Sequence, residues 1–123
     1  MAVLVIDDSL AMRSLLRDIL SGSGFKVVEA GDGREALECL KRGDDIEAVL
    51  VDWQMPHMDG CDFLRAVRRF EAYRDLPMLM VSAESELERV AEALAAGADE
   101  YVMKPFTRDA LLGKLNLLGL SSH

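Results

Sequence analysis

Short apolar runs alternate with helically spaced apolar residues along this chain. The runs are too short for helices and are bounded by Asp, Gly, Pro and Ser, which is typical of strands buried within a sheet. The third run is apolar from Ala48 to Val51, so we expect both of its faces to be covered. The runs predict five strands, at Ala2–Ile6, Phe25–Ala30, Glu47–Val51, Pro77–Val81 and Tyr101–Met103.

A helical pattern follows each predicted strand. The first helix begins at the N-cap residue Ser9 and stops at Gly22 and Gly24. We expect it to face the core with Met12, Leu15, Leu16, Ile19 and Leu20. The later helices carry the apolar sets Ala36, Leu37 and Leu40; Phe63, Leu64, Val67 and Phe70; Leu87, Val90, Ala91 and Leu94; and Leu111, Leu112, Leu115 and Leu118.

Local signals also mark the ends of the later helices. Gly43 and Gly97 are expected to end the second and fourth helices, and Thr107 or Asp109 can cap the last. Strands that alternate with such helices predict an α/β fold, a doubly wound (βα)5 parallel sheet with right-handed crossovers and helices on both faces. We expect one domain over residues 1–120 and a short, frayed tail at 121–123.

The composition narrows the class of function. Of the 123 residues, 50% are hydrophobic, and the net charge of −8 argues against direct binding to nucleic acid, because such domains present a basic face. No apolar run approaches the roughly 20 residues of a membrane span, and no charged leader is present, so we expect a cytoplasmic protein without a membrane partner. Cys39 and Cys61 form no C-x-x-C pair, which favours two buried thiols in a reducing compartment.

Reactive side chains follow four of the five predicted strands. Asp7 and Asp8 follow the first, Asp52 the third, Ser82 the fourth and Lys104 the fifth. Only the second strand, which ends at Ala30 and Gly31, is followed by nothing reactive. Ligands of open parallel sheets bind beyond the carboxyl ends of the strands, where the strand order reverses. We therefore predict the flavodoxin-like order 2-1-3-4-5, in which the second strand is an edge and the aspartates meet.

Three carboxylates at one place repel one another, and a hard divalent cation would relieve the repulsion. Mg²⁺ prefers oxygen ligands and typically takes one or two carboxylates with several waters. Asp8 and Asp52 could bind it directly and Asp7 through water, with a backbone carbonyl from the loop after Asp52. The alternative is that the aspartates are solvated loop residues that cap the first helix.

The set as a whole suggests phosphoryl chemistry. Lys104 and the Ser82 hydroxyl suit the oxygens of a phosphoryl group, and Asp52 could be the nucleophile, since carboxylates form acyl phosphates. A cis bond between Lys104 and Pro105 would turn the lysine back over the site. Taken alone, Ser82 is more typical of a residue at the N-terminus of a helix than of a phosphate ligand. His57 reads as a surface residue, which leaves the site without an obvious general base.

These residues resemble the motifs of the response-regulator receiver domain, over the full length of the chain and most closely in its stand-alone, CheY-type members. The matching positions are Asp7-Asp8, Asp52 within the segment 52–60, Ser82-Ala83, Tyr101 and Lys104-Pro105-Phe106. The resemblance implies a single-domain response regulator in chemotaxis or motility signalling, monomeric and not an enzyme. A histidine kinase or phosphotransfer protein would be its phosphodonor.

The resemblance also implies a role for each position at the phosphorylation site. Asp52 would accept the phosphoryl group, and Mg²⁺ would be held by Asp8, Asp52 and the backbone carbonyl of Gln54, with Asp7 helping through water. Lys104 would pair with the phosphate.

The remaining implied roles concern the switch and its decay. Ser82, where threonine is commoner in the family, would hydrogen-bond the phosphate, and Tyr101 would then be drawn inward. Partner affinity would change at the surface formed by helix 4, strand 5 and helix 5. Gln54 and Glu84 occupy positions that tune dephosphorylation.

Other functions stay open beside this one. The acidic stretch 85–88 is less basic than in members that bind the flagellar switch, although Lys114 remains on the last helix. The chain could instead be a phosphate sink or relay receiver outside chemotaxis. A Mg²⁺-dependent phosphatase with an aspartyl nucleophile would be expected to have a cap insertion over its substrate pocket, and the sequence shows no such segment. A degenerate receiver that acts only as a scaffold would be expected to lack some of these residues.

Overall fold

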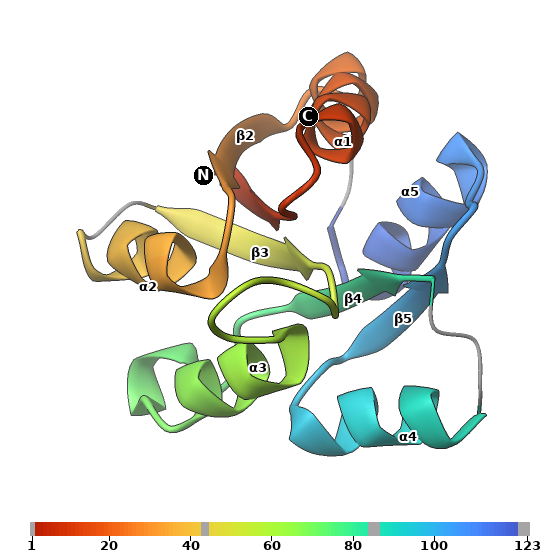
Figure 1. The fold of residues 1–123 in the computed structure, drawn as a ribbon. Helices are drawn as coiled ribbons and strands as arrows, with labels where there is room; N and C mark the ends of the chain where they lie inside the picture. The colour runs from red at the N-terminus through yellow and green to blue at the C-terminus, as the bar shows by residue number, and fades with distance from the viewer. Residues whose placement is uncertain (1, 43–44, 84–86, 121–123) are drawn as a thin grey trace.

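A computed structural model describes residues 2–42, 45–83 and 87–120 of the chain. Its five strands form one sheet in the order β2-β1-β3-β4-β5, and every neighbouring pair is parallel (Figure 1). The predicted strand order is therefore confirmed. The strands are β1 (Ala2–Ile6), β2 (Lys26–Ala30), β3 (Ile46–Val51), β4 (Met78–Ser82) and β5 (Glu100–Met103).

Helices cover both faces of the sheet. In Figure 1, α1 and α5 lie on one side, and α2, α3 and α4 lie on the other. The helices are α1 (Leu10–Gly22), α2 (Gly33–Lys41), α3 (Gly60–Arg68), the short 3-10 helix η1 (Glu71–Tyr73), α4 (Leu87–Ala96) and α5 (Arg108–Leu117). This is the doubly wound arrangement expected from the alternating pattern.

Side-chain oxygens begin four of the helices at the edge of the sheet where the strands end. The N-cap oxygens of Ser9, Asp32, Asp59 and Thr107 accept hydrogen bonds from backbone N–H groups in the first turns of α1, α2, α3 and α5. Each bond satisfies a donor that a helix N-terminus leaves without a partner. Ser9 and Thr107 were expected in this role, whereas Asp32 and Asp59 were not predicted as caps.

The core has two layers, one on each face of the sheet. Alternate residues of β3 belong to different layers: Val49 and Val51 face α2, α3 and α4, while Ala48 and Leu50 face α1 and α5. All four are at most 1% exposed. Burial on both faces explains why β3 reads as a continuous apolar run, as predicted.

Four apolar residues are less buried than their patterns suggested, and one of them is Ala91 on α4, which is exposed. Leu15 is 47% exposed because it lies at the border of the α1 stripe, whose buried members are Leu16 and Leu20. Leu94 is 45% exposed because consecutive residues are about 100° apart on a helix, and α4 instead buries Ala93. Phe70 is 48% exposed because α3 ends at Arg68.

Some expectations fall on residues outside the described ranges. These are the end of the second helix at Gly43, the position of Glu84, residues 85 and 86 of the acidic stretch and the tail at 121–123. Cys39 and Cys61 are buried and form no disulfide in the structure, as predicted. Among the described residues, no helix is both long and apolar enough to cross a membrane.

Candidate functional site

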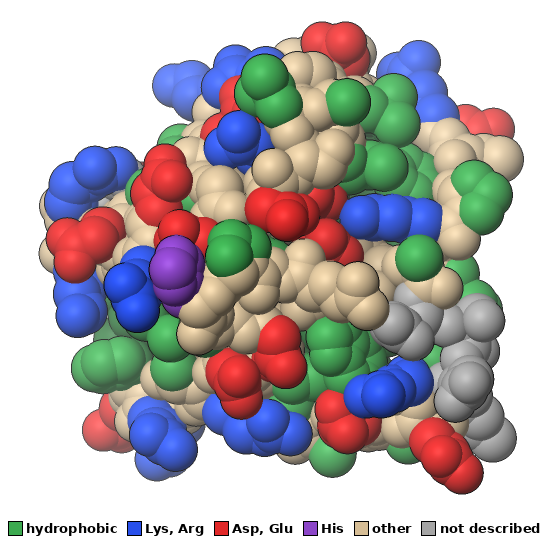
Figure 2. All heavy atoms as spheres, viewed as in Figure 1, with side chains coloured by type: hydrophobic (Ala, Val, Ile, Leu, Met, Phe, Trp, Pro, Cys, Tyr) green, Lys and Arg blue, Asp and Glu red, His purple; other side chains and the backbone are tan. Residues whose placement is uncertain are grey.

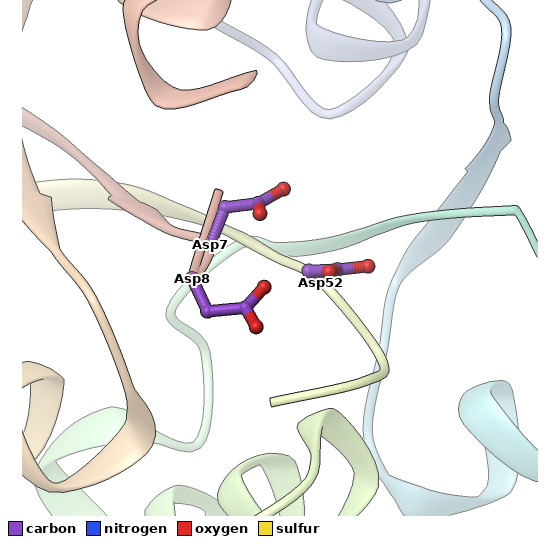
Figure 3. A group of neighbouring side chains, drawn as sticks. All are labelled: Asp7, Asp8 and Asp52. Atoms are coloured by element: carbon purple, nitrogen blue, oxygen red, sulfur yellow. The ribbon is translucent and has the colours of Figure 1, made fainter. Parts of the chain in front are cut away.

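The ends of β1 and β3 bring three carboxylates together. Backbone hydrogen bonds extend the sheet past both strands: Asp52 N donates to Ile6 O over 2.9 Å, and Asp7 N donates to Ala30 O over 3.2 Å. Oxygens of Asp7, Asp8 and Asp52 lie within 4.8 Å of one another (Figure 3). The aspartates therefore meet at the predicted edge of the sheet, between β1 and β3, where the strand order reverses.

The carboxylates differ in exposure. Asp7 is only 2% exposed, Asp52 is half-buried and Asp8 is exposed. Asp7 also has a local role, because its Oδ1 accepts a hydrogen bond from Ser9 N over 2.9 Å, while Ser9 itself caps α1. Asp7 is thus neither solvated nor the N-cap of α1, so the alternative interpretation does not hold for it. A cluster of hard oxygen donors at this spacing fits a divalent cation such as Mg²⁺.

Lys104, directly after the end of β5, reaches the carboxylates of Asp7 and Asp52 with its side chain. Its Nζ is 3.0 Å from Asp7 Oδ2 and 3.4 Å from Asp52 Oδ1, and its side chain is 18% exposed. Its backbone N donates to Ser82 O over 2.9 Å, and its bond to Pro105 is cis. On the face drawn in Figure 2, acidic side chains gather near the centre with a basic side chain beside them. One cation thus partly balances three anions.

The charge on Asp52 is costly in this setting. Burial raises the pKa of its carboxyl above the ordinary 3.8, and the nearby Asp7 carboxylate raises it further. The attraction of Lys104 and the hydrogen bond from Trp53 N oppose these effects without cancelling them. Asp52 therefore gains from any additional cation at this edge of the sheet.

A small pocket opens beside Asp52. It holds about 220 Å³ and is lined by Asp52, Gln54, Ser82, Ala83 and Lys104. Ser82 ends β4 and is 2% exposed. The pocket therefore combines a carboxylate, a hydroxyl and an ammonium group in a space suited to a small tetrahedral anion. The structure thus brings together most of the predicted site residues.

The loop after Asp52 depends on Gly60, the last residue of the segment 52–60. A Cβ on Gly60 would lie 2.4 Å from the backbone oxygen of Asp52. The Gly60 N–H donates to Trp53 O over 2.7 Å. This close approach holds the loop directly against the end of β3.

The other predicted residues are distributed around the site. Tyr101 is 8% exposed and packs in the core layer of α2, α3 and α4, so it is not a solvent-facing edge residue. Gln54 is exposed at the rim of the pocket, and His57 is exposed with a φ of 71°. Glu84 lies outside the described residues.

A second cavity lies between β5 and α5. It holds about 370 Å³. Its lining includes Tyr101, the 49% exposed Met103 and Lys114, which pairs with Glu100 at 2.9 Å. This mainly apolar hollow is lined by residues of β5, of α5 and of the loop between them, and β5 lies two strands from β3.

Known proteins are similar to this chain in both sequence and fold. The response regulator receiver domain model matches residues 3–116. The chain is 42% identical over 117 residues to chemotaxis protein CheY-3 of Vibrio cholerae, covering 94% of this chain and 89% of that protein. It is 42% identical over 116 residues to CheY of Pseudomonas aeruginosa, covering 94% and 93%. The structure of Vibrio cholerae CheY4 superposes with a TM-score of 0.88 at 36% identity, covering 96% of this chain and 98% of the other.

Proposed function

This chain belongs to the response regulator receiver domain family, and from that premise we propose that it is a response regulator that accepts a phosphoryl group on Asp52. The observation that carries the proposal is the position of Asp52. Its carboxylate lines a small pocket together with Ser82 and Lys104, and lies beside Asp7 and Asp8.

The reaction follows from the groups around the pocket. A carboxylate oxygen of Asp52 attacks the phosphorus of a phosphohistidine on a histidine kinase or phosphotransfer protein. The new O–P bond forms as the N–P bond breaks, and the imidazole leaves on the donor. Lys104 exchanges its contacts with carboxylates for the phosphoryl oxygens, and the Ser82 hydroxyl donates to one of them.

The acidic residues supply the metal ligands of this proposal. Asp8, Asp52 and the backbone carbonyl of Gln54 would hold Mg²⁺, with Asp7 acting through water. The bound ion would neutralise both the carboxylates and the incoming phosphoryl oxygens. Asp7 also keeps Lys104 close to the site, because the two are paired at 3.0 Å.

The output surface is the face of α4, β5 and α5. Tyr101 and Met103 line its cavity, and β5 pairs with β4 up to Ser82, so movement of Ser82 reaches this face through the sheet. We propose a protein effector there, in chemotaxis or motility signalling, since the similar proteins are named for chemotaxis. A phosphate-sink role would use the same site without such an effector.

The protein acts by changing partners and not by turning over a substrate. The pocket is small, and the described loops contain no cap segment over it. Gln54 and Glu84 tune the slow loss of the phosphoryl group to water. We propose that the chain acts as a monomer in the cytoplasm, where its two free thiols stay reduced.

Incubation with acetyl phosphate and Mg²⁺ tests the proposal. Intact-mass spectrometry should show an added mass of about 80 Da, the mass of one phosphoryl group, and EDTA should prevent it. Asp52→Asn should remain unlabelled. Equal labelling of that variant would rule out Asp52 as the acceptor, and turnover of many equivalents of a phosphate ester would favour a phosphatase.

A further inference from the structure

Trp53 links the phosphorylation pocket to the helices on one face of the sheet. Its backbone N–H donates to Asp52 Oδ1 over 2.9 Å, and its backbone oxygen accepts from Gly60 N over 2.7 Å. Its side chain is 5% exposed and packs in the core layer of α2, α3 and α4. The same residue thus holds the Asp52 carboxylate with its backbone N–H and packs among these helices with its side chain.

Arg89 lies over this ring from the beginning of α4. Its guanidinium carbon is 5.6 Å from the centroid of the Trp53 ring, within the range of a cation–π contact. Arg89 is the third residue of α4, the helix that follows the segment after Ser82. The contact therefore joins the start of α4 to the end of β3, independently of the chain that connects β4 to α4.

Arg89 contacts the Trp53 ring although two glutamates are close to it in the sequence. Glu88 precedes it, and Glu92 lies three residues further along the same helix, a spacing at which side chains can pair. Within residues 2–42, 45–83 and 87–120, Arg89 nevertheless forms no ion pair with either of them. The cation–π contact with Trp53 is therefore the interaction that the structure describes for this guanidinium.

We propose that Arg89 is a positioning residue for Asp52, acting through the Trp53 ring to stabilise the arrangement in which the Asp52 carboxylate is held by Trp53 N and Lys104. This inference rests on the proposed function. The contact accompanies the pairing of Lys104 with Asp7 and Asp52, which a phosphoryl group would replace. In this proposal the contact is weaker once a phosphoryl group replaces that pairing, so by linkage its removal should favour the phosphorylated arrangement.

Beryllofluoride, which mimics the acyl phosphate, provides the test. Trp53 is the only tryptophan, so its fluorescence reports a titration with beryllofluoride in Mg²⁺. We expect Arg89→Met to lower the half-saturating concentration about two- to fivefold, the effect of one exposed cation–π contact. The emission of this variant should also differ from wild type before beryllofluoride is added. Arg89→Lys, which keeps a cation, should restore most of both properties.

Arg65→Met is the matched control. Arg65 is an exposed arginine on α3 that pairs with Asp62 at 3.5 Å, so its removal changes the net charge equally and should leave the titration unchanged. A thermal melt checks that every variant is folded. The inference is overturned if Arg89→Met titrates like wild type, or if Arg89→Lys behaves like Arg89→Met. A wild-type protein that does not respond to beryllofluoride would instead overturn the proposed function.

Discussion

At the scale of single residues, the ionised carboxylate of Asp52 lowers the stability of the folded protein, although it is the reactive group of the proposed function. Its carboxyl pKa is raised mainly by burial and then by Asp7, although Lys104 opposes the shift. A group whose pKa is raised on folding favours the folded state below its unfolded pKa, and that contribution is lost as the pH rises through the folded pKa. The ionised Asp52 therefore costs stability at neutral pH.

Asp52→Asn should accordingly raise the melting temperature by a few degrees at pH 7.5 in EDTA, because it removes the buried charge and leaves Lys104 to pair with Asp7. The difference from wild type should shrink as the pH falls from 7.5 and the wild-type carboxyl takes up a proton. Calorimetry over this pH range measures both effects. A variant less stable than wild type at neutral pH would contradict this account of the pKa.

Cys61 is predicted to be unreactive for a related reason. Burial, followed by the carboxylates of Asp59 and Glu92, raises the pKa of its thiol to about 11. At pH 8 only about one thiol in a thousand is then ionised, and the thiolate is the reactive form. Native protein should react with a disulfide reagent at least about 100-fold more slowly than unfolded protein. Rapid reaction of the native protein would show that the thiol is accessible.

At the scale of elements, the loop between β3 and α3 is a rigid part of the site. Gly60→Ala should slow acetyl phosphate labelling about tenfold or more, because its Cβ would displace the Asp52 backbone and small displacements of reacting groups are costly. Gly113→Ala on α5 is the control, since a Cβ there meets nothing within 4 Å. It should label normally and gain about 0.5–1 kcal/mol of stability. Equal labelling of both variants would mean that the loop adapts.

Arg68 joins several elements at the opposite end of the sheet. Its guanidinium donates to the backbone oxygens of Tyr73, Leu76 and Gly97, and pairs with Asp99 at 2.9 Å. Its side chain is 17% exposed. The end of α3 is thereby fixed to the loops that lead into β4 and β5.

Arg68→Met should destabilise the protein by about 2–4 kcal/mol, because it leaves partly buried carbonyl oxygens without donors. Urea unfolding measures the change. Arg65→Met, which removes an exposed pair, should cost less than about 1 kcal/mol. If the two variants were equally stable, the bonds of Arg68 would contribute nothing beyond a surface ion pair.

At the scale of the whole molecule, the strand order could be predicted because chemistry and burial agreed. Reactive residues followed every strand except β2, and β2 is indeed an edge with mostly partly exposed residues. Asp7 and Asp52 are 45 positions apart in sequence, yet the parallel sheet brings their strand ends together. Periodicity was less informative about which helical residues are buried, as Leu15 and Leu94 show.

The contacts that were missed depend on tertiary placement. The stacking of Arg89 on Trp53 joins residues of different elements, and neither residue type signals it locally. The close approach of Gly60 to Asp52 depends on the path of a loop, which a glycine in the sequence only permits. Such contacts follow once the fold is known, but not from hydrophobic spacing.

The most direct test of the central claim is to locate the phosphoryl group. Protein labelled with acetyl phosphate and Mg²⁺ is reduced with borohydride, which converts an aspartyl phosphate to homoserine, and is then mapped by peptide mass spectrometry. We predict homoserine at position 52 alone, with none in EDTA. Homoserine at position 7 or 8, or none in the Mg²⁺ sample, would contradict the assignment of Asp52 as the phosphoacceptor.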